Sequence, residues 1–301
     1  MSGGGERLSV EEGRIVRAIS GFYDVETDAG VVRCRAPGSF KKRGIKPLVG
    51  DLVVLSQSGP AEGVIDELRP RRTELVRPPI ANVSQALLVV ALLDPPPSLH
   101  QIDKMLAMIE WFGLPAAIVL TKLDLPGADR ELRRVTGIYD RLPYPLLPLS
   151  LRQNVGVASL VDFLEGEITV LTGQSGVGKS TMLGYLIPGA TALTGEVSER
   201  SRRGRQTTTA VQLYRYGTGF IADTPGFSQF DLWAVDPPQL SGLFRDIAEV
   251  SRDCQFRSCL HETEEGCAVR AAAEEGRIAP SRYAGYLQLL LELKDAKARR
   301  Y

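Results

Sequence analysis

The sequence predicts a multidomain α/β protein, and three observations lead to this prediction. Between residues 13 and about 75, short alternating apolar and polar segments are separated by turn signals, as in the strands of a small barrel. From Gln85 onward, continuous apolar runs alternate with helical patterns, which indicates a three-layer α/β domain with buried parallel strands. After about Pro237 the pattern is helical and encloses a cluster of cysteines. The expected division is a flexible tail over 1–12, a β-barrel over 13–75, an α/β domain over 76–237 and a helical domain over 238–301.

The composition favours a globular protein of the cytoplasm. The 301 residues are 44% hydrophobic and 24% charged, and Lys plus Arg equals Asp plus Glu at 36 each. Because these charges cancel, affinity for nucleic acid would have to come from local clusters. The N-terminal segment MSGGGERLSVEEG lacks the apolar core of a signal peptide, and the longest apolar run, Ala86 to Leu93, is too short to cross a bilayer. We therefore expect no membrane partner.

The barrel prediction depends on turn chemistry. The segment YDVETDAGVVRCRA alternates around a turn at Asp28–Gly30, and VGDLVVL starts with a second turn. No helical periodicity of useful length occurs in this region. A closed barrel is the natural interpretation, because closure removes the unpaired strand edges. The segment RPRRTELVRPP then has the composition of a linker.

The α/β prediction depends on strands that are apolar throughout. Four such runs are QALLVVAL, AAIVLTK, PLLPLS and ITVLTG. Helical patterns lie between them: Ile102, Leu106 and Ile109 share one helix face, and Leu160 and Phe163 share another. This alternation indicates parallel strands that are buried on both faces by helices.

One strand–loop–helix segment carries the pattern of a phosphate-binding loop. The sequence LTGQSGVGKST matches G-x-x-x-x-G-K-[ST] between the strand pattern EITVL and the helical pattern STMLGYLI. Its glycines let successive backbone N–H groups turn toward a phosphate at the positive end of a helix. Lys179 is expected to reach the β- and γ-phosphates, and Ser180 is expected to bind Mg²⁺. The nucleotide-binding residues predicted here are Gly173, Gln174, Ser175, Gly176, Val177, Gly178, Lys179, Ser180 and Thr181.

Two later segments are expected to complete the magnesium site. FIADTPGF is a strand that ends in Asp-x-x-Gly, so Asp223 can hold the Mg²⁺ shell and the N–H of Gly226 can contact the γ-phosphate. The basic, polar segment RSRRGRQTTTAVQLYRY lies between this strand and the phosphate loop. One of the threonines at 207–209 is expected to ligate Mg²⁺ when the segment closes over the nucleotide, and we favour Thr208.

The segment LTKLDL matches the guanine-reading motif of GTPases, although it precedes the phosphate loop by about fifty residues. Asp124 would accept hydrogen bonds from guanine and Lys122 would lie along the ring, at the carboxyl end of a strand where α/β sheets bind ligands. Ser150 ends the next apolar strand and would support the base, and Thr121 stands where most GTPases carry Asn. The five GTPase elements thus occur in the order 4-5-1-2-3. This order predicts a circularly permuted Ras-like P-loop GTPase domain over residues 76–237.

The cysteine cluster predicts a structural zinc site. Three thiols and one imidazole occur within fourteen residues, which matches the closed tetrahedral set that holds Zn²⁺ in structural sites. Cys34 and His100 lie outside the cluster and are expected to be structural residues. The predicted zinc ligands are Cys254, Cys259, His261 and Cys267.

The barrel, the permuted GTPase motifs and the Cys₃His spacing together resemble the ribosome small-subunit-dependent GTPase A family, from about Gly13 to the last helix. The resemblance implies an OB-type barrel and GTP hydrolysis that is stimulated by the small (30S) ribosomal subunit late in the maturation of that subunit. We expect 16S-type rRNA, GTP and GDP as further partners, and a monomeric protein. The basic clusters FKKRGIK, RPRR, ERSRRGR and KDAKARR fit contacts with RNA.

The motifs do not directly identify the catalytic residue. Phe227 stands where Ras-like enzymes have a Gln that orients water, and an apolar ring cannot orient water. Gln206 stands before the threonine run where the family usually has His, so Gln206 is the predicted catalytic residue together with Thr208. Because the Gln of Ras-like enzymes is absent, the alternative is an RNA-binding module in which the nucleotide controls RNA binding and turnover is negligible. An ATP-dependent P-loop enzyme is disfavoured by Asp124.

Overall fold

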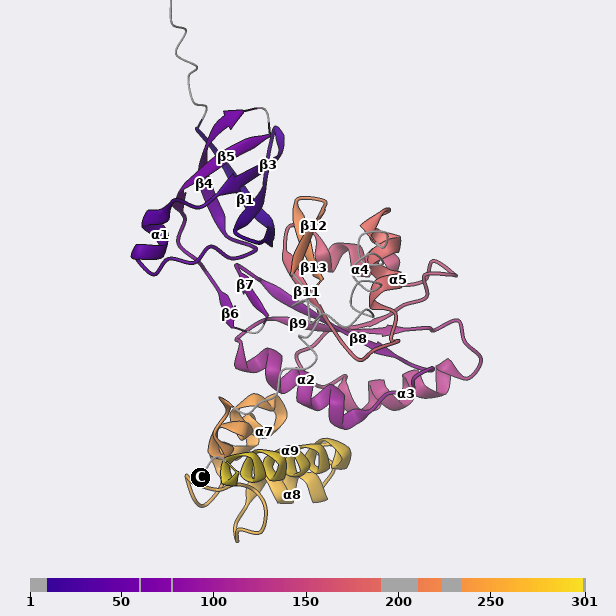
Figure 1. The fold of residues 1–301 in the computed structure, drawn as a ribbon. Coiled ribbons are helices and arrows are strands. Elements are labelled where there is room, and N and C mark those ends of the chain that lie inside the picture. Colours follow the sequence, from indigo (N-terminus) through magenta and orange to yellow (C-terminus); the bar gives the residue numbers. More distant parts are fainter. Residues whose placement is uncertain (1–9, 60, 77, 191–210, 224–233, 300–301) are drawn as a thin grey trace, which may run out of the picture. The chain divides into compact units, whose positions relative to one another are not determined.

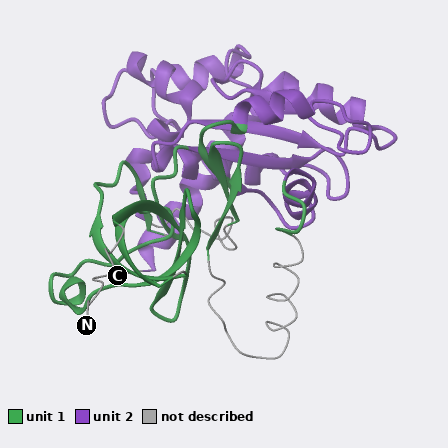
Figure 2. Cartoon of the chain, turned by 90° about the horizontal axis from the view of Figure 1, so that it is seen from above, with its two compact units in different colours: residues 1–84, 164–170, 187–227 green, residues 85–163, 171–186, 228–301 purple. Residues whose placement is uncertain are grey.

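The structure is a computed structural model that describes residues 10–59, 61–76, 78–190, 211–223 and 234–299 (Figure 1). The chain divides into two compact units (Figure 2). The first unit consists of residues 1–84, 164–170 and 187–227, and the second consists of residues 85–163, 171–186 and 228–301.

A five-stranded barrel forms the N-terminal part of the first unit. Its strands are β1 (Val10–Ile19), β2 (Phe22–Thr27), β3 (Gly30–Arg35), β4 (Leu52–Gly59) and β5 (Glu62–Leu68). The barrel closes because β1 pairs with β2 on one side and with β4 on the other, while β3 and β5 pair in parallel. Alternate residues such as Ile15, Val25 and Val53 point inward and are fully buried, which is the period of two predicted for these strands. The barrel prediction is confirmed, and β1 begins at Val10, inside the segment predicted as a tail.

A short helix, α1 (Gly38–Lys42), interrupts the barrel where no helix was expected from the sequence. Its five residues are too few to show a helical period, and Phe40 is the residue of this helix that is buried. The helix therefore depends on the packing of one aromatic ring rather than on a local pattern.

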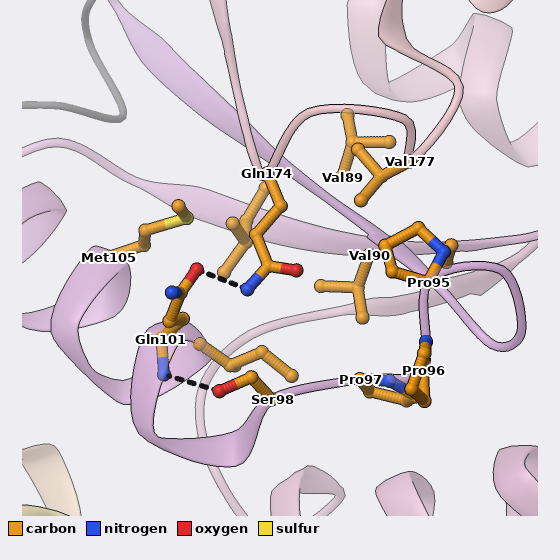
Figure 3. Close-up of a pocket in the computed structure, with 13 residues that line it drawn as sticks. Val89, Val90, Pro95, Pro96, Pro97, Ser98, Gln101, Met105, Gln174 and Val177 are labelled. Atoms are coloured by element: carbon orange, nitrogen blue, oxygen red, sulfur yellow. Dashed lines mark hydrogen bonds between the residues drawn. The ribbon is translucent and has the colours of Figure 1, made fainter.

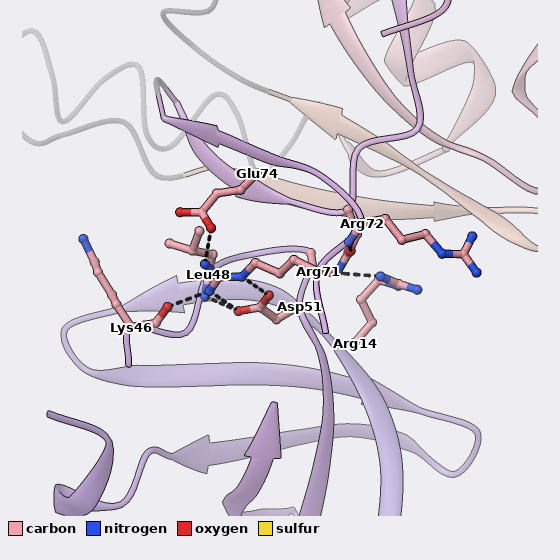
Figure 4. A network of polar contacts seen from close by, with 9 residues as sticks. Arg14, Lys46, Leu48, Asp51, Arg71, Arg72 and Glu74 are labelled. Atoms are coloured by element: carbon pink, nitrogen blue, oxygen red, sulfur yellow. Dashed lines mark hydrogen bonds and ion pairs between the residues drawn. The ribbon is translucent and has the colours of Figure 1, made fainter. Parts of the chain in front are cut away.

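The basic linker after the barrel is fixed by a polar network (Figure 4). Asp51 is 0% exposed, and Arg71 donates to both of its carboxylate oxygens at 2.7 and 2.8 Å. Arg71 also donates to the carbonyl of Lys46 and to Glu74, at 2.7 and 2.6 Å. The guanidinium of Arg71 is therefore committed to contacts within the protein, although 22% of its side chain is exposed. Whether the RPRR cluster contacts RNA stays a prediction.

Three further strands extend the first unit beyond the barrel. They are β11 (Ile168–Thr172), of which residues 168–170 belong to this unit, β12 (Gln212–Tyr216) and β13 (Gly219–Asp223). A separate hairpin consists of β6 (Glu74–Val76) and β7 (Pro79–Ala81). Strand β12 pairs with β1 of the barrel through Arg17 and Gln212, and β13 pairs with β12 and with β11. The strand that ends in Asp223 is thus continuous with the barrel sheet.

The second unit has the predicted α/β architecture. Its parallel strands are β8 (Gln85–Ala91), β9 (Ala116–Thr121) and β10 (Leu146–Pro148). Every residue of β8 and β9 is buried, as expected for strands covered on both faces. The helices of this part are α2 (Leu99–Trp111), α3 (Ala128–Tyr139), α4 (Val157–Leu164) and α5 (Lys179–Leu186), and α2 and α3 lie along one face of the sheet (Figure 1).

The C-terminal segment of the second unit is helical, as predicted. It contains 3-10 helices over Pro237–Leu243 and Ser251–Asp253, and the helices α7 (Arg245–Val250), α8 (Ala268–Glu274) and α9 (Pro280–Ala298). The residues Tyr286, Leu289, Leu290 and Leu293 form a buried apolar face of α9. Among the described residues, no helix combines the length and the apolar character needed to cross a membrane.

Candidate functional site

The predicted phosphate loop connects β11 to α5, in the strand–loop–helix context that the motif requires. Gly173 has a φ of +145°, and a Cβ on this residue would lie 2.2 Å from the carbonyl oxygen of Val89. Only glycine therefore fits where the loop leaves the strand. The ammonium group of Lys179 is held at the loop by the carbonyls of Gly173 and Gln174, at 2.6 and 2.5 Å. Ser180 lies exposed in the first turn of α5.

A cavity of about 320 Å³ lies beside this loop, at the carboxyl ends of β9 and β10. Five residues that were predicted from two distant motifs line it together: Thr121, Lys122, Asp124, Gly178 and Thr181. Ser150, between the lining residues Leu149 and Leu151, donates its hydroxyl to Asp124 Oδ1 at 2.9 Å. The fold therefore assembles the guanine motif, its supporting serine and one side of the phosphate loop into one concave site.

Thr121 connects the guanine motif to the phosphate loop. Its side chain is buried, and its hydroxyl donates to the carbonyl oxygen of Val177 at 2.6 Å. Thr121 stands where most GTPases carry Asn, so it has no side-chain amide to offer near the base. The structure shows that the hydroxyl bridges the two motifs, which are 56 residues apart in the chain.

Two details of the cavity were not predicted from the sequence. Lys122 has a φ of +62°, a conformation that costs energy for a non-glycine residue and often marks a functional site. Its ammonium group donates to the carbonyl oxygen of Asp94. Arg152 lies 3.8 Å from Asp124 Oδ2 with 83% of its side chain exposed, so it faces the carboxylate that would read guanine. Arg152 follows Ser150 by two residues, and this short spacing is the sequence feature from which its position near Asp124 could have been predicted.

The magnesium residues are described in part. Asp223 is the last residue of β13 in the first unit, half-buried and opposite Gln212 of β12. Its place at the carboxyl end of a strand that runs parallel to β11 agrees with the predicted context. Gln206, Thr208 and Gly226 lie outside the described residues.

The four predicted zinc ligands converge in the second unit. Cys254, Cys259, His261 and Cys267 place their ligand atoms within 4.8 Å of one another. Nδ1 of His261 lies 3.5 Å from the sulfur of Cys254 and from that of Cys267. Tetrahedral Zn²⁺ with Zn–S bonds of about 2.3 Å separates its ligand atoms by about 3.8 Å, so this donor set fits the ion.

The protonation chemistry of the cluster also suits a metal ion. Burial raises the pKa of the Cys259 thiol to about 12, so this thiol keeps its proton until a cation replaces that proton. Burial lowers the pKa of His261, which leaves a neutral imidazole that can ligate. Zinc uptake at this site is thus coupled to the release of protons.

The loop of the zinc cluster has supports that no sequence motif indicated. Glu264 accepts hydrogen bonds from the backbone N–H groups of Leu260, Glu262 and Thr263 at 2.7 to 3.1 Å. Burial alone would raise the pKa of Glu264, yet these hydrogen bonds lower it to about 2. The hydroxyl of Tyr283 on α9 donates to the carbonyl of His261 at 2.7 Å. The ligand loop is therefore shaped by a carboxylate and attached to α9.

Comparisons with known proteins agree with this architecture. A family model described as RsgA GTPase matches residues 68–233, and one described as RsgA N-terminal domain matches residues 12–65. A Bacillus cereus protein named small ribosomal subunit biogenesis GTPase RsgA is 41% identical over 292 residues, which cover 96% of this chain and 99% of the relative. A protein of the same name from Carboxydothermus hydrogenoformans is 43% identical over 285 residues, which cover 94% of this chain and 97% of the relative.

Solved structures support the same assignment. YjeQ from Thermotoga maritima matches with a TM-score of 0.82 at 33% identity, over 95% of this chain and 99% of that chain. YloQ, described as a circularly permuted GTPase, matches with a TM-score of 0.80 at 33% identity, over 98% of each chain. The permuted motif order, the cavity that these motifs form and the full-length relatives lead to one conclusion: this chain is a GTP hydrolase that belongs to the RsgA GTPase family.

Proposed function

We propose that this protein binds the small ribosomal subunit through 16S-type rRNA, hydrolyses GTP there late in the maturation of that subunit, and acts as a monomer in the cytoplasm. The observation that carries this proposal is the cavity that unites Asp124 with the phosphate loop. The full-length relatives named for small-subunit biogenesis support the choice of partner. The proposed domains remain the barrel over 13–75, the permuted GTPase over 76–237 and the zinc domain over 238–301.

In this proposal each part of the nucleotide meets a different element. Asp124 accepts from the guanine N1–H and N2–H₂ groups, while Ser150 holds the other oxygen of the carboxylate. Lys122 lies along the base. The backbone N–H groups of the phosphate loop and Lys179 hold the phosphates.

The proposal includes two metal ions with different roles. Zn²⁺ on the Cys₃His cluster would be structural, because the four protein ligands would leave no open position for a substrate. Mg²⁺ arrives with the nucleotide and would be held by Ser180, Asp223 and Thr208. When bound, it neutralises the charge that develops on the β- and γ-phosphates.

Titration of purified small subunits into a GTPase assay tests the proposal. We expect subunits to raise kcat by at least roughly tenfold, and to do so less as salt rises, because the contact neutralises rRNA phosphates. A different result would favour the RNA-binding module. In that case GTP turnover would stay negligible at saturating subunits, while the nucleotide would still control RNA binding. Sedimentation of the free protein tests the monomeric state.

Gln206→Ala is expected to lose most of this stimulation while GTP affinity stays nearly unchanged. The amide of Gln206 can accept from water and donate to the γ-phosphate, which is the orientation that phosphoryl transfer requires. The matched control is Gln206→His, which should retain stimulation because the family usually has His there. If Gln206→Ala is stimulated as strongly as the parent, the subunit itself must supply the orienting group.

Thr121→Val is expected to weaken the binding of both GTP and GDP by about fivefold to tenfold. The substitution removes a buried hydrogen bond and leaves the carbonyl of Val177 unsatisfied, at a cost of about 1 kcal/mol or somewhat more. Thr121→Ser keeps the hydroxyl and should bind like the parent. Fluorescent guanine nucleotides give the two dissociation constants, and equal values for the Val variant and the parent would show that the bridge is not needed for binding.

A further inference from the structure

Helix α2 contacts the phosphate loop at its first turn (Figure 3). Gln174, the second residue of the loop motif, donates its side-chain amide to the side-chain oxygen of Gln101. The backbone N–H of Gln101 is in turn held by the hydroxyl of Ser98, the N-cap of α2, at 3.4 Å. The cavity between loop and helix measures only about 10 Å³, which is barely enough for one water molecule. The phosphate loop is therefore closely packed against this turn.

The same turn of α2 is attached to α9 of the C-terminal helical segment. Glu292 of α9 pairs through one carboxylate oxygen with His100 Nε2 at 2.8 Å, and through the other with Lys104 Nζ at 3.1 Å. These two residues flank Gln101 in the sequence. One carboxylate of α9 thus spans the helical turn that carries the contact to the phosphate loop.

A second attachment lies in the protein interior. Arg282 of α9 is 2% exposed and donates to Asp103 Oδ1 of α2 at 2.7 Å, and Asp103 is 1% exposed. Arg282 also donates from Nη2 to Asp246 Oδ1 at 2.8 Å. Its guanidinium carbon lies 4.5 Å from the ring centroid of Phe244. Removing one member of such a buried set would leave an uncompensated charge, which is strongly destabilising. The position of α9 on α2 is therefore tightly specified.

The backbone of α9 also approaches α2 closely at this point. A Cβ on Gly285 would lie 2.3 Å from Asp103 Oδ2, so no larger residue fits without a shift. The three α2 residues involved, at 100, 103 and 104, lie within about 4.5 Å of rise from Gln101. Because a helical turn is stiff on this scale, a small displacement of α9 must move the first turn of α2.

We propose that Gln101 is a positioning residue for the phosphate loop. Helix α9 fixes the position of Gln101 through the contacts of Glu292 and Arg282 with α2. The C-terminal helices thereby tune nucleotide affinity from outside the nucleotide cavity. A partner that shifts α9 would change the affinity of the loop for the β-phosphate, which GTP and GDP share. This inference rests on the proposed function in one respect, which is that the phosphate loop must bind guanine nucleotides.

The test measures the dissociation constants of GTP and GDP for a double-mutant cycle in the full chain. We expect Gln101→Leu to weaken both nucleotides by roughly fivefold, because Gln174 loses its acceptor. Glu292→Gln should weaken both by roughly twofold to threefold, since this carboxylate is partly exposed. If Gln101 carries the effect of α9, then Glu292→Gln adds little once residue 101 is Leu. In both single variants kcat at saturating GTP should stay close to that of the parent.

The matched control removes another ion pair of α9 that does not reach α2. Lys297 pairs with Asp236 at 2.9 Å, and Lys297→Gln should leave both dissociation constants unchanged. The proposal is overturned if Gln101→Leu binds like the parent, or if Glu292→Gln keeps its full effect in the Gln101→Leu background. Failure of the unmodified protein to bind GTP would contradict the proposed function instead.

Discussion

Asp124→Asn is expected to convert the protein from a guanine binder into a xanthine binder. In the structure, one carboxylate oxygen of Asp124 accepts from Ser150, and the other faces the cavity near Arg152. This arrangement leaves an acceptor for the guanine N1–H and N2–H₂ groups. Two charge-assisted hydrogen bonds of this kind are worth about 1.5–3 kcal/mol each, so GTP affinity should fall by at least roughly a hundredfold. The Asn amide can instead donate to the extra oxygen of xanthine.

Competition of GTP, XTP and ATP for a fluorescent nucleotide measures this change. The variant should prefer XTP over GTP, while ATP stays excluded in both proteins. Asp129→Asn makes the same chemical change on the exposed first turn of α3 and should leave the preference for GTP intact. Equal binding of ATP and GTP by the unmodified protein would contradict the role of Asp124.

Removal of the zinc ion is expected to have the largest structural effect. We expect about one zinc per chain by elemental analysis. Structural zinc contributes on the order of 10 kcal/mol to the folding of such segments, so Cys259→Ser should loosen the region after Pro237. Hydrogen exchange should then rise in the ligand loop first, because all four ligands lie between Cys254 and Cys267 and lose their common ion.

GTP binding should survive in the Cys259→Ser variant, and GTP affinity should fall only as far as α9 shifts on α2. Helix α9 is attached to α2 by Arg282 and Glu292, and neither residue belongs to the zinc cluster. The zinc content of the unmodified protein should fall with decreasing pH, because protons compete for a thiol such as Cys259 whose pKa is raised to about 12. Cys34→Ser changes a buried cysteine of the barrel and should keep one zinc. An ordered C-terminal segment without metal would show that the cluster is not a zinc site.

The sequence by itself determined those features whose geometry is encoded in contiguous residues. The phosphate loop is one, because its glycines and the flanking strand and helix lie in a single stretch of chain. The zinc ligands are another, since four donors within fourteen residues can converge through one loop. Burial on both faces of β8 and β9 was also predictable, because their apolar runs leave no polar face. The permuted motif order follows from the sequence directly.

Only the tertiary structure decided which distant side chains meet. Thr121 and Val177 are joined by a hydrogen bond across two motifs, and Arg71 is drawn from a linker onto the buried Asp51. Arg282 pairs with Asp103 although 179 residues separate them. Such pairs depend on strand register, on helix packing and on the removal of charge from water, and a local pattern encodes none of these. Charged residues that look like solvent-facing surface in the sequence therefore include those that hold the interior together.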